Sequence, residues 1–235
     1  MPRGRLNEKH VQRAALEWLA SYYADKVGVQ AVYAEMETVV SANCKLGSGR
    51  ADGLVASLMP DETVYTAALE AKSARTLPNI MLRYGDMQWL LHALIAGLLG
   101  MVVAGSIGWF FSDSWWLRWI VPPVAFLAAA FAYLLLTTEH ARYRLIDVVQ
   151  QVKRYPANEQ WIAVSADAYN ELDTALQEAL LTDCRNEGLG LLRVRSTNQV
   201  TPLEKPQPRP RPKGLGDFLA CYARSDVIRR KLHMQ

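Results

Sequence analysis

The chain has 235 residues, enough for one domain with a sizeable core plus an accessory segment. Its composition, 51% apolar and 21% charged, is typical of a soluble protein, and its net charge of +3 neither requires nor excludes a nucleic-acid partner. The cysteines are odd in number, scattered and without a CxxC pair, which argues against a disulfide framework or a zinc site and favours a reducing cytoplasm (Cys44, Cys184 and Cys221).

The first 85 residues predict a helix followed by three strands. Residues 7–26 carry apolar side chains at helical spacing, and Asn7 is a suitable N-cap. Their charge also excludes the apolar core of a signal peptide. Strand-like runs follow at 29–40, 50–58 and 64–73, and the turn signals between them predict an antiparallel meander. The third run is rich in alanine, so a helix remains open there.

Two apolar stretches, at 89–111 and 115–137, are each over 20 residues long, the length that crosses a bilayer core about 30 Å thick. Tryptophans lie near their ends, where aromatic belts form. The connection at 112–114 is short, so the two helices must run antiparallel. We therefore expect a transmembrane hairpin over residues 86–139. Small residues along both helices permit close packing and are compatible with a homo-oligomer formed through the hairpin (Gly97, Gly100, Gly105, Gly108, Ala128, Ala129, Ala130 and Ala132).

Basic residues flank the hairpin on the side of the chain ends, whereas its outer turn offers only Arg118 (the flanks hold Arg75, Arg83, Arg142 and Arg144). The positive-inside rule then places both soluble parts in the cytoplasm. The expectation is a two-pass protein of the inner (cytoplasmic) membrane, in contact with the lipid bilayer, with its N- and C-termini on the cytoplasmic side.

The remaining elements alternate between helix and strand. A helix is predicted at 141–155, a strand at 160–165, a helix at 167–187 and a strand at 189–195. Without the hairpin, this order predicts an α/β fold with a mixed sheet flanked by helices. We expect residues 1–85 and 140–200 to form one domain that the hairpin interrupts. Residues 201–235 then supply a Pro-rich linker at 202–212 and a basic helix at 216–233.

Acidic and basic side chains cluster on the second and third predicted strands. Asp52 lies in the second strand, and Glu70 and Lys72 lie in the third. Residues two apart on a strand share a face, so Glu70 and Lys72 project together, and a neighbouring strand can bring Asp52 beside them. Two such carboxylates, with the backbone carbonyl of Ala71, form a hard oxygen site suited to Mg²⁺.

This Asp52…Glu70-Ala71-Lys72 pattern resembles the PD-(D/E)XK nuclease superfamily, which has the restriction-endonuclease-like fold. The resemblance implies that Asp52 and Glu70 bind Mg²⁺, for which Mn²⁺ can substitute, and that Lys72 serves catalysis. It also implies a further acidic residue, for which Glu8 or Glu17 on the first helix are candidates. Two others lie on the first strand (Glu35 and Glu37). One departure is that Ala51 stands where the family name has proline.

A second motif, Gln151 to Tyr155, resembles the Q-x-x-x-Y helix of the RecB-like branch of that superfamily. Gln151 and Tyr155 are four apart and would share a helical face. The resemblance implies that Gln151 belongs to the catalytic site and that Lys153, Arg154 and Tyr155 contact the nucleic-acid backbone or position the site. The inserted hairpin is a second departure from the family pattern.

Together these features predict a membrane-anchored, metal-dependent nuclease that hydrolyses phosphodiester bonds of nucleic acid on the cytoplasmic side, with DNA as the expected substrate. An alternative is an inactive nuclease-fold module that binds nucleic acid or a partner protein at the membrane. A second alternative makes the hairpin a pore or membrane disruptor, but it has almost no polar residues to line a channel.

Overall fold

The computed structural model describes residues 6–26, 28–76, 82–84, 86–111, 114–137, 144–196, 199–210 and 216–234. The chain divides into two compact units. The first, here called the sheet unit, comprises Met1–Met81 and Ile146–Gln235. The second, the hairpin unit, comprises Leu82–Leu145. β4 (Leu82–Tyr84) and β5 (Arg144–Ile146), whose last residue falls in the sheet unit, form a two-stranded sheet.

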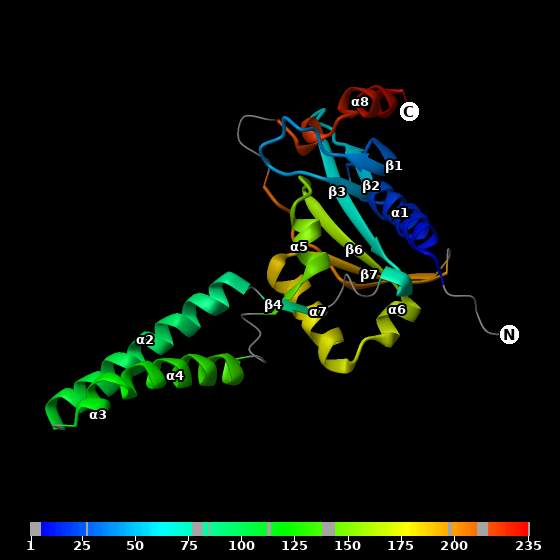
Figure 1. The fold of residues 1–235 in the computed structure, drawn as a ribbon. Helices are drawn as coiled ribbons and strands as arrows, with labels where there is room; N and C mark the ends of the chain where they lie inside the picture. Colours follow the sequence, from blue (N-terminus) through cyan, green and yellow to red (C-terminus); the bar gives the residue numbers. More distant parts are fainter. Residues whose placement is uncertain are drawn as a thin grey trace. The chain divides into compact units, whose positions relative to one another are not determined.

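A mixed six-stranded sheet, in the order β1-β2-β3-β6-β7-β8, forms the centre of the sheet unit (Figure 1). The first three strands form the expected antiparallel meander, and the alanine-rich run is a strand. β6 and β7 add parallel to β3, and β8 adds antiparallel to β7. The α/β prediction is confirmed for these strands: β1 Ala31–Val39, β2 Arg50–Leu58, β3 Val64–Lys72, β6 Glu159–Ser165, β7 Gly190–Ser196 and β8 Gln199–Glu204.

One face of the sheet is covered by α1 (Glu8–Ala24), the predicted N-terminal helix. The side chain of Asn7 caps it by accepting a hydrogen bond from the backbone N–H of His10. Its apolar stripe packs on alternate residues of the strands, including Leu69, Ala71 and Trp161. Because neighbours along a strand point to opposite faces, Glu70 and Lys72 project from the other face of the sheet.

The helices after the hairpin differ from the sequence prediction. α5 spans only Asp147–Lys153, and the expected helical residues 144–146 form β5. The start of that predicted helix, at 141–143, lies outside the described residues. The helix predicted at 167–187 is broken into α6 (Ala166–Glu171) and α7 (Thr174–Glu187). Asp173 causes the break, because its side chain caps a new helix by accepting from the N–H of Leu176.

The C-terminal segment belongs to the sheet unit. Part of the predicted Pro-rich linker is the edge strand β8, where Pro202 is tolerated since one side of an edge strand needs no ladder hydrogen bond. The expected basic helix is divided into a 3₁₀ helix, η3 (Phe218–Cys221), and α8 (Ser225–His233). The buried Asp217 caps η3 and holds α8 through two hydrogen bonds from Arg229, both 2.7 Å.

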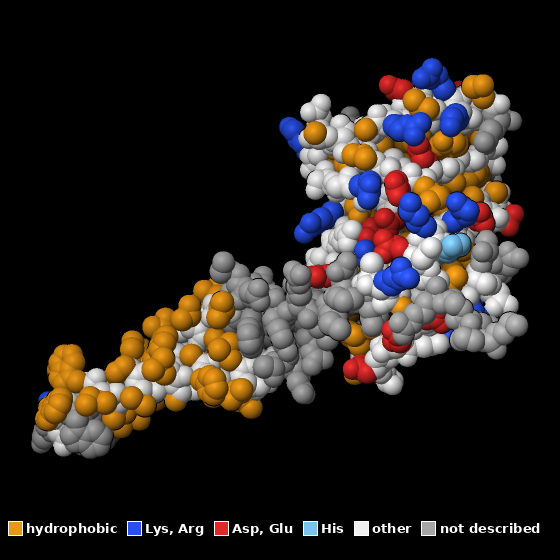
Figure 2. Space-filling model, turned by 45° about the vertical axis from the view of Figure 1, so that its right-hand side comes forward, with side chains coloured by type: hydrophobic (Ala, Val, Ile, Leu, Met, Phe, Trp, Pro, Cys, Tyr) orange, Lys and Arg blue, Asp and Glu red, His pale blue; other side chains and the backbone are white. Residues whose placement is uncertain are grey.

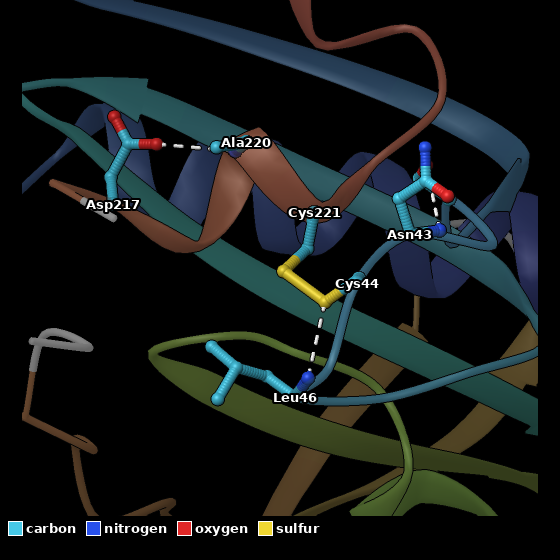
Figure 3. Close-up of a disulfide and its surroundings, with 7 residues drawn as sticks. Asn43, Cys44, Leu46, Asp217, Ala220 and Cys221 are labelled. Atoms are coloured by element: carbon cyan, nitrogen blue, oxygen red, sulfur yellow. Dashed lines mark hydrogen bonds between the residues drawn. A yellow bond between two sulfur atoms is a disulfide. The ribbon is translucent and has the colours of Figure 1, made fainter. Parts of the chain in front are cut away.

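A disulfide joins Cys44, in the β1–β2 loop, to Cys221 at the end of η3 (Figure 3). The Cα atoms are 5.1 Å apart although the residues are 177 positions apart in sequence. The expectation that the cysteines form no disulfide was wrong, because the odd count includes Cys184, which is buried and free. The cysteine count therefore no longer favours a reducing compartment.

The hairpin unit contains α2 (Asp86–Phe111), α3 (Trp115–Trp119) and α4 (Val121–Thr137). Among the described residues, Leu90–Phe110 is the one helix long and apolar enough to cross a membrane. The second predicted span is broken at Ile120, because Pro122 and Pro123 have no N–H to donate to the preceding turn. They open α4, which is left with 17 residues.

The two long helices of this unit pack through their small residues. A Cβ atom added at Gly97 would lie 2.8 Å from the Phe126 ring, and one at Gly100 would lie 2.8 Å from the Cβ of Ala129. Residues further along α2 meet earlier parts of α4, since Gly105 faces Pro122, so the helices run antiparallel. The outward faces carry exposed large apolar side chains, such as Leu99 and Leu136 (Figure 2).

Candidate active site

Asp52 and Glu70 lie opposite each other on adjacent strands. β2 and β3 pair with Gly53 opposite Leu69, so the next position places Asp52 opposite Glu70. Opposite residues of an antiparallel pair share a face of the sheet. Here a side-chain oxygen takes the place of a backbone carbonyl as the acceptor between the two strands. Oδ2 of Asp52 accepts a hydrogen bond of 2.8 Å from the N–H of Ala71.

Glu70 is held from both of its carboxylate oxygens. Lys72 donates from Nζ to Oε1 at 2.6 Å, and the Tyr155 hydroxyl donates to Oε2 at 2.8 Å. Glu70 is 1% exposed and Lys72 is 4% exposed, so this is a buried ion pair. Gln151 donates from Nε2 to the Tyr155 hydroxyl at 3.2 Å. Residues from β3 and from the α5 region thus meet in one hydrogen-bonded network.

Tyr155 lies in the place that suits the second of its two expected roles, positioning the site. It lies just beyond the end of α5 and is 2% exposed, with its hydroxyl turned towards Glu70. Burial raises the pKa of Tyr155 well above its ordinary value of 10.0, and the charge of Glu70 raises it further. The hydroxyl therefore stays protonated and acts as a donor, which makes Tyr155 a positioning residue for Glu70.

The carboxyl group of Asp52 titrates at an unusual pH. Burial raises its pKa from 3.8 to about 6, and the nearby negative charge of Glu70 adds to the increase. The Ala71 N–H and the Lys72 ammonium oppose the shift, and the charge of Glu8 adds to it. Three carboxylates thus act on one another at this place, and a bound cation would relieve their repulsion.

Among the four candidate supporting acids, Glu8 is the one whose charge acts on Asp52. Its Oε2 is buried without a hydrogen-bond partner. Glu17 is exposed on α1, and Glu35 accepts a hydrogen bond from Arg224 of the C-terminal segment. Glu37 is 3.8 Å from Arg50.

Two features beside Asp52 were not found in the sequence. Gln12 donates from Nε2 to the backbone carbonyl of Asp52, and it lies one turn after Glu8 on α1. The four-residue spacing of Glu8 and Gln12, which places both on one helix face, was the available signal.

The second feature is an irregularity in the pairing of β1 with β2 opposite Asp52. The pairing passes from Met36–Gly53 to Thr38–Ala51, and between these pairs Glu37 has a φ of 55°. A left-handed non-glycine residue costs about 1–3 kcal/mol and often marks a functional site.

The two basic residues expected to contact the substrate, Lys153 and Arg154, differ in their surroundings. Lys153 forms an ion pair of 2.7 Å with Glu187 on α7. Arg154 is exposed, and its backbone carbonyl accepts from the N–H of Ser48 in the β1–β2 loop. Figure 2 shows acidic side chains gathered on one face of the sheet unit with basic side chains around them. A polyanion would meet this positive rim before the acidic centre.

Comparison with protein-family models, curated proteins and solved structures found no match to this chain. The geometry of the site is therefore the basis for its function.

Within the described part of the chain, no three His, Cys, Asp or Glu side chains are grouped closely enough to hold a metal ion together. Mg²⁺ does not require such a group, because it keeps several waters and is commonly held by one or two carboxylates and the substrate phosphates. Asp52 and Glu70, one step apart across the β2–β3 pair, supply that number.

Proposed function

We propose that the protein is a Mg²⁺-dependent nuclease whose active site consists of Asp52, Glu70 and Lys72. The observation that carries the proposal is the pairing of β2 with β3, which sets two carboxylates opposite each other and a lysine one step further along the same face. A lysine beside two carboxylates is an arrangement suited to attack on a phosphodiester, a substrate with its own negative charge.

The donor set fits a hard divalent cation. Asp52 and Glu70 would hold it, with the carbonyl of Ala71, and the unpartnered Oε2 of Glu8 is available to a coordinated water. When bound, Mg²⁺ supplies Lewis-acid activation of the phosphate and of a water. Because the pKa of Asp52 is raised to about 6, the site carries its full negative charge only above that pH. Cation binding is therefore expected to weaken in mild acid.

The protein side chains have separate tasks in this mechanism. Lys72 is hydrogen-bonded to Glu70 in the structure, and its ammonium stabilises the negative charge that develops on the phosphate during attack. Tyr155 and Gln151 hold Glu70 in its orientation. Gln12 fixes the backbone at Asp52. Arg154 follows α5 directly and is exposed, so its side chain is free to meet a phosphate of the nucleic-acid backbone.

The proposal includes a membrane anchor. The exposed apolar faces of α2 and α4 have no covering among the described residues, and a lipid bilayer is the medium that accepts them. The cytoplasmic orientation rests on the arginine flanks. Arg142 lies outside the described residues, as do the side chains of Arg83 and Arg144. The disulfide points the other way, since disulfides persist in oxidising compartments.

Cleavage of DNA and RNA by the full chain in detergent tests the nuclease assignment. Wild type is expected to cut in Mg²⁺ or Mn²⁺ and not in EDTA. Asp52→Asn and Lys72→Ala should each lower the rate about a hundredfold or more, since each removes a group aimed at the reacting phosphate. Glu178→Gln, an exposed acid on α7, is the matched control and should cut at the wild-type rate.

Equal cutting by wild type and both site variants would mean that the assigned residues are not catalytic. If the wild type bound nucleic acid but never cut it, the chain would be an inactive nuclease-fold module instead.

A further inference from the structure

Two arginines lie on the same face of the sheet as the proposed site. In the parallel pairing, Lys72 is opposite Val164 and Val164 is opposite Arg193. Residues in such a row point to one face, and Arg195 follows two positions later on the same strand. Strands are about 4.8 Å apart, so the backbones at Lys72 and Arg193 are separated by about 10 Å.

The surface at these arginines is hollowed. A cavity of about 250 Å³ is lined by Arg193, Arg195, Gln199 and Thr201. A second, of about 730 Å³, shares Arg195 and Gln199 and includes Asp167 and Asn170. The first cavity lies along β7 and β8, and the second reaches α6 at the carboxyl end of β6, the sheet edge at which Lys72 ends β3. In open α/β sheets, ligands bind in the crevice at this edge.

Arg193 is held in place without losing its charge. Its Nη2 donates to Oδ1 of Asn170 at 3.1 Å, and its guanidinium lies 5.6 Å from the centre of the Tyr169 ring. Both partners are neutral, and the buried Nε has no hydrogen-bond partner. Arg195 is exposed and forms no ion pair with any residue that the structure describes. Two positive charges therefore face the cavities with unused donors.

We propose that Arg193 and Arg195 bind backbone phosphates of the nucleic-acid strand whose scissile phosphate lies at Asp52, Glu70 and Lys72. The inference rests on the proposed nuclease function. A guanidinium offers a planar set of donors that matches phosphate oxygens.

Binding measured without metal separates this inference from catalysis. The full chain in non-ionic detergent and EDTA is titrated against fluorescein-labelled single-stranded and duplex DNA of about 20 nucleotides, at several salt concentrations. Arg193→Ala/Arg195→Ala is expected to weaken binding tenfold or more and to lower the slope of log K against log salt by about 2, one for each lost phosphate contact.

Matched variants identify the cause of that loss. Arg195→Ala alone changes an exposed side chain, so it tests the site if the double variant fails to fold, and it should lower the slope by about 1. Arg195→Lys keeps the charge and should keep the slope. Arg185→Ala removes an arginine that is ion-paired with Glu204 at 2.9 Å, and it should bind as the wild type does.

The outcomes distinguish the two proposals. Unchanged affinity and slope in Arg195→Ala and in the folded double variant overturn the inference, as does a wild type that binds no nucleic acid. Should the wild type cut DNA while these variants bind normally, the nuclease proposal stands and the assignment of Arg193 and Arg195 to phosphate binding fails. Should the variants lose binding while the wild type never cuts, the assignment of the two arginines to phosphate binding stands and the nuclease proposal fails.

Discussion

Asp52 is the residue on which both the proposed chemistry and the expected pH response of the site depend. Its place was predictable, because the two-residue period of a strand and the order of the runs bring it beside Glu70 and Lys72. Its raised pKa was not, since burial and the charges of Glu70 and Glu8 arise only when α1, β2 and β3 pack together. The same packing decided between the two roles left open for Tyr155, because it makes the hydroxyl a donor to Glu70.

The titration of Asp52 predicts a pH-dependent stability. A carboxyl whose pKa is raised in the folded state favours folding when protonated, so this stabilisation is complete below about pH 3.8 and is lost as the pH rises through about 6. Asp52→Asn keeps an oxygen to accept from Ala71 and does not titrate. Without divalent cations, the variant should gain on the order of 1–2 kcal/mol relative to wild type between pH 4 and pH 7.

Thermal unfolding of wild type and Asp52→Asn at pH 4, 5, 6 and 7 in EDTA measures this difference. Parallel melting-temperature profiles would contradict the assigned titration. Added Mg²⁺ should stabilise the wild type more at pH 7 than at pH 5, because only the ionised carboxylate binds it.

At the level of elements, periodicity located the helices and strands better than it located their breaks. α1, the meander and the apolar helix α2 lie near their predicted positions. The breaks arise from single residues that change the backbone hydrogen bonding: Asp173 divides α6 from α7, and Pro122 and Pro123 divide α3 from α4. The aspartate and the two prolines were visible in the sequence. The apolar periodicity continues across them, so it predicts one unbroken helix in each case.

The packing of α2 on α4 predicts different effects for the same substitution at two glycines. Gly100→Ala places a Cβ atom 2.8 Å from that of Ala129, so the helices must move apart, at a cost of about 1–3 kcal/mol. Gly105→Ala is the matched control, because its Cβ would meet Pro122 at an ordinary 3.7 Å. Both substitutions gain the same helix propensity, about 1 kcal/mol.

Hydrogen exchange of the full chain in detergent, read by mass spectrometry, reports on the two helices separately from the sheet unit. Gly100→Ala should speed exchange in α2 and α4 relative to Gly105→Ala. Equal exchange in the two variants would mean that the helices do not meet at Gly100.

For the whole molecule, insertion into a membrane is the prediction that follows from the exposed hairpin. The full chain should stay in the membrane pellet through alkaline carbonate extraction. Leu98→Arg/Val102→Arg changes two exposed side chains of α2 and should shift the protein towards the soluble fraction, since a central arginine costs about 2.5–3.5 kcal/mol in membrane insertion. Lys205→Ala, a charge change outside the hairpin, is the control.

Recovery of the wild-type chain in the soluble fraction would contradict the anchor. The side of the membrane is read separately, by protease added to intact spheroplasts. A sheet unit in the cytoplasm stays uncut. A sheet unit on the outer side of the membrane, the location that the disulfide favours, is digested.

The sequence alone determined the fold class and the placing of Asp52, Glu70 and Lys72 on one face of the sheet. Strand alternation and element order are local properties that nearby residues specify. Tertiary structure decided what depends on distant partners. Cys44 meets Cys221 across 177 positions, β8 forms from an apparent linker by pairing with β7, and Arg193 joins the row of Lys72 through β6. Such contacts are set by register and packing between segments, which no local pattern encodes.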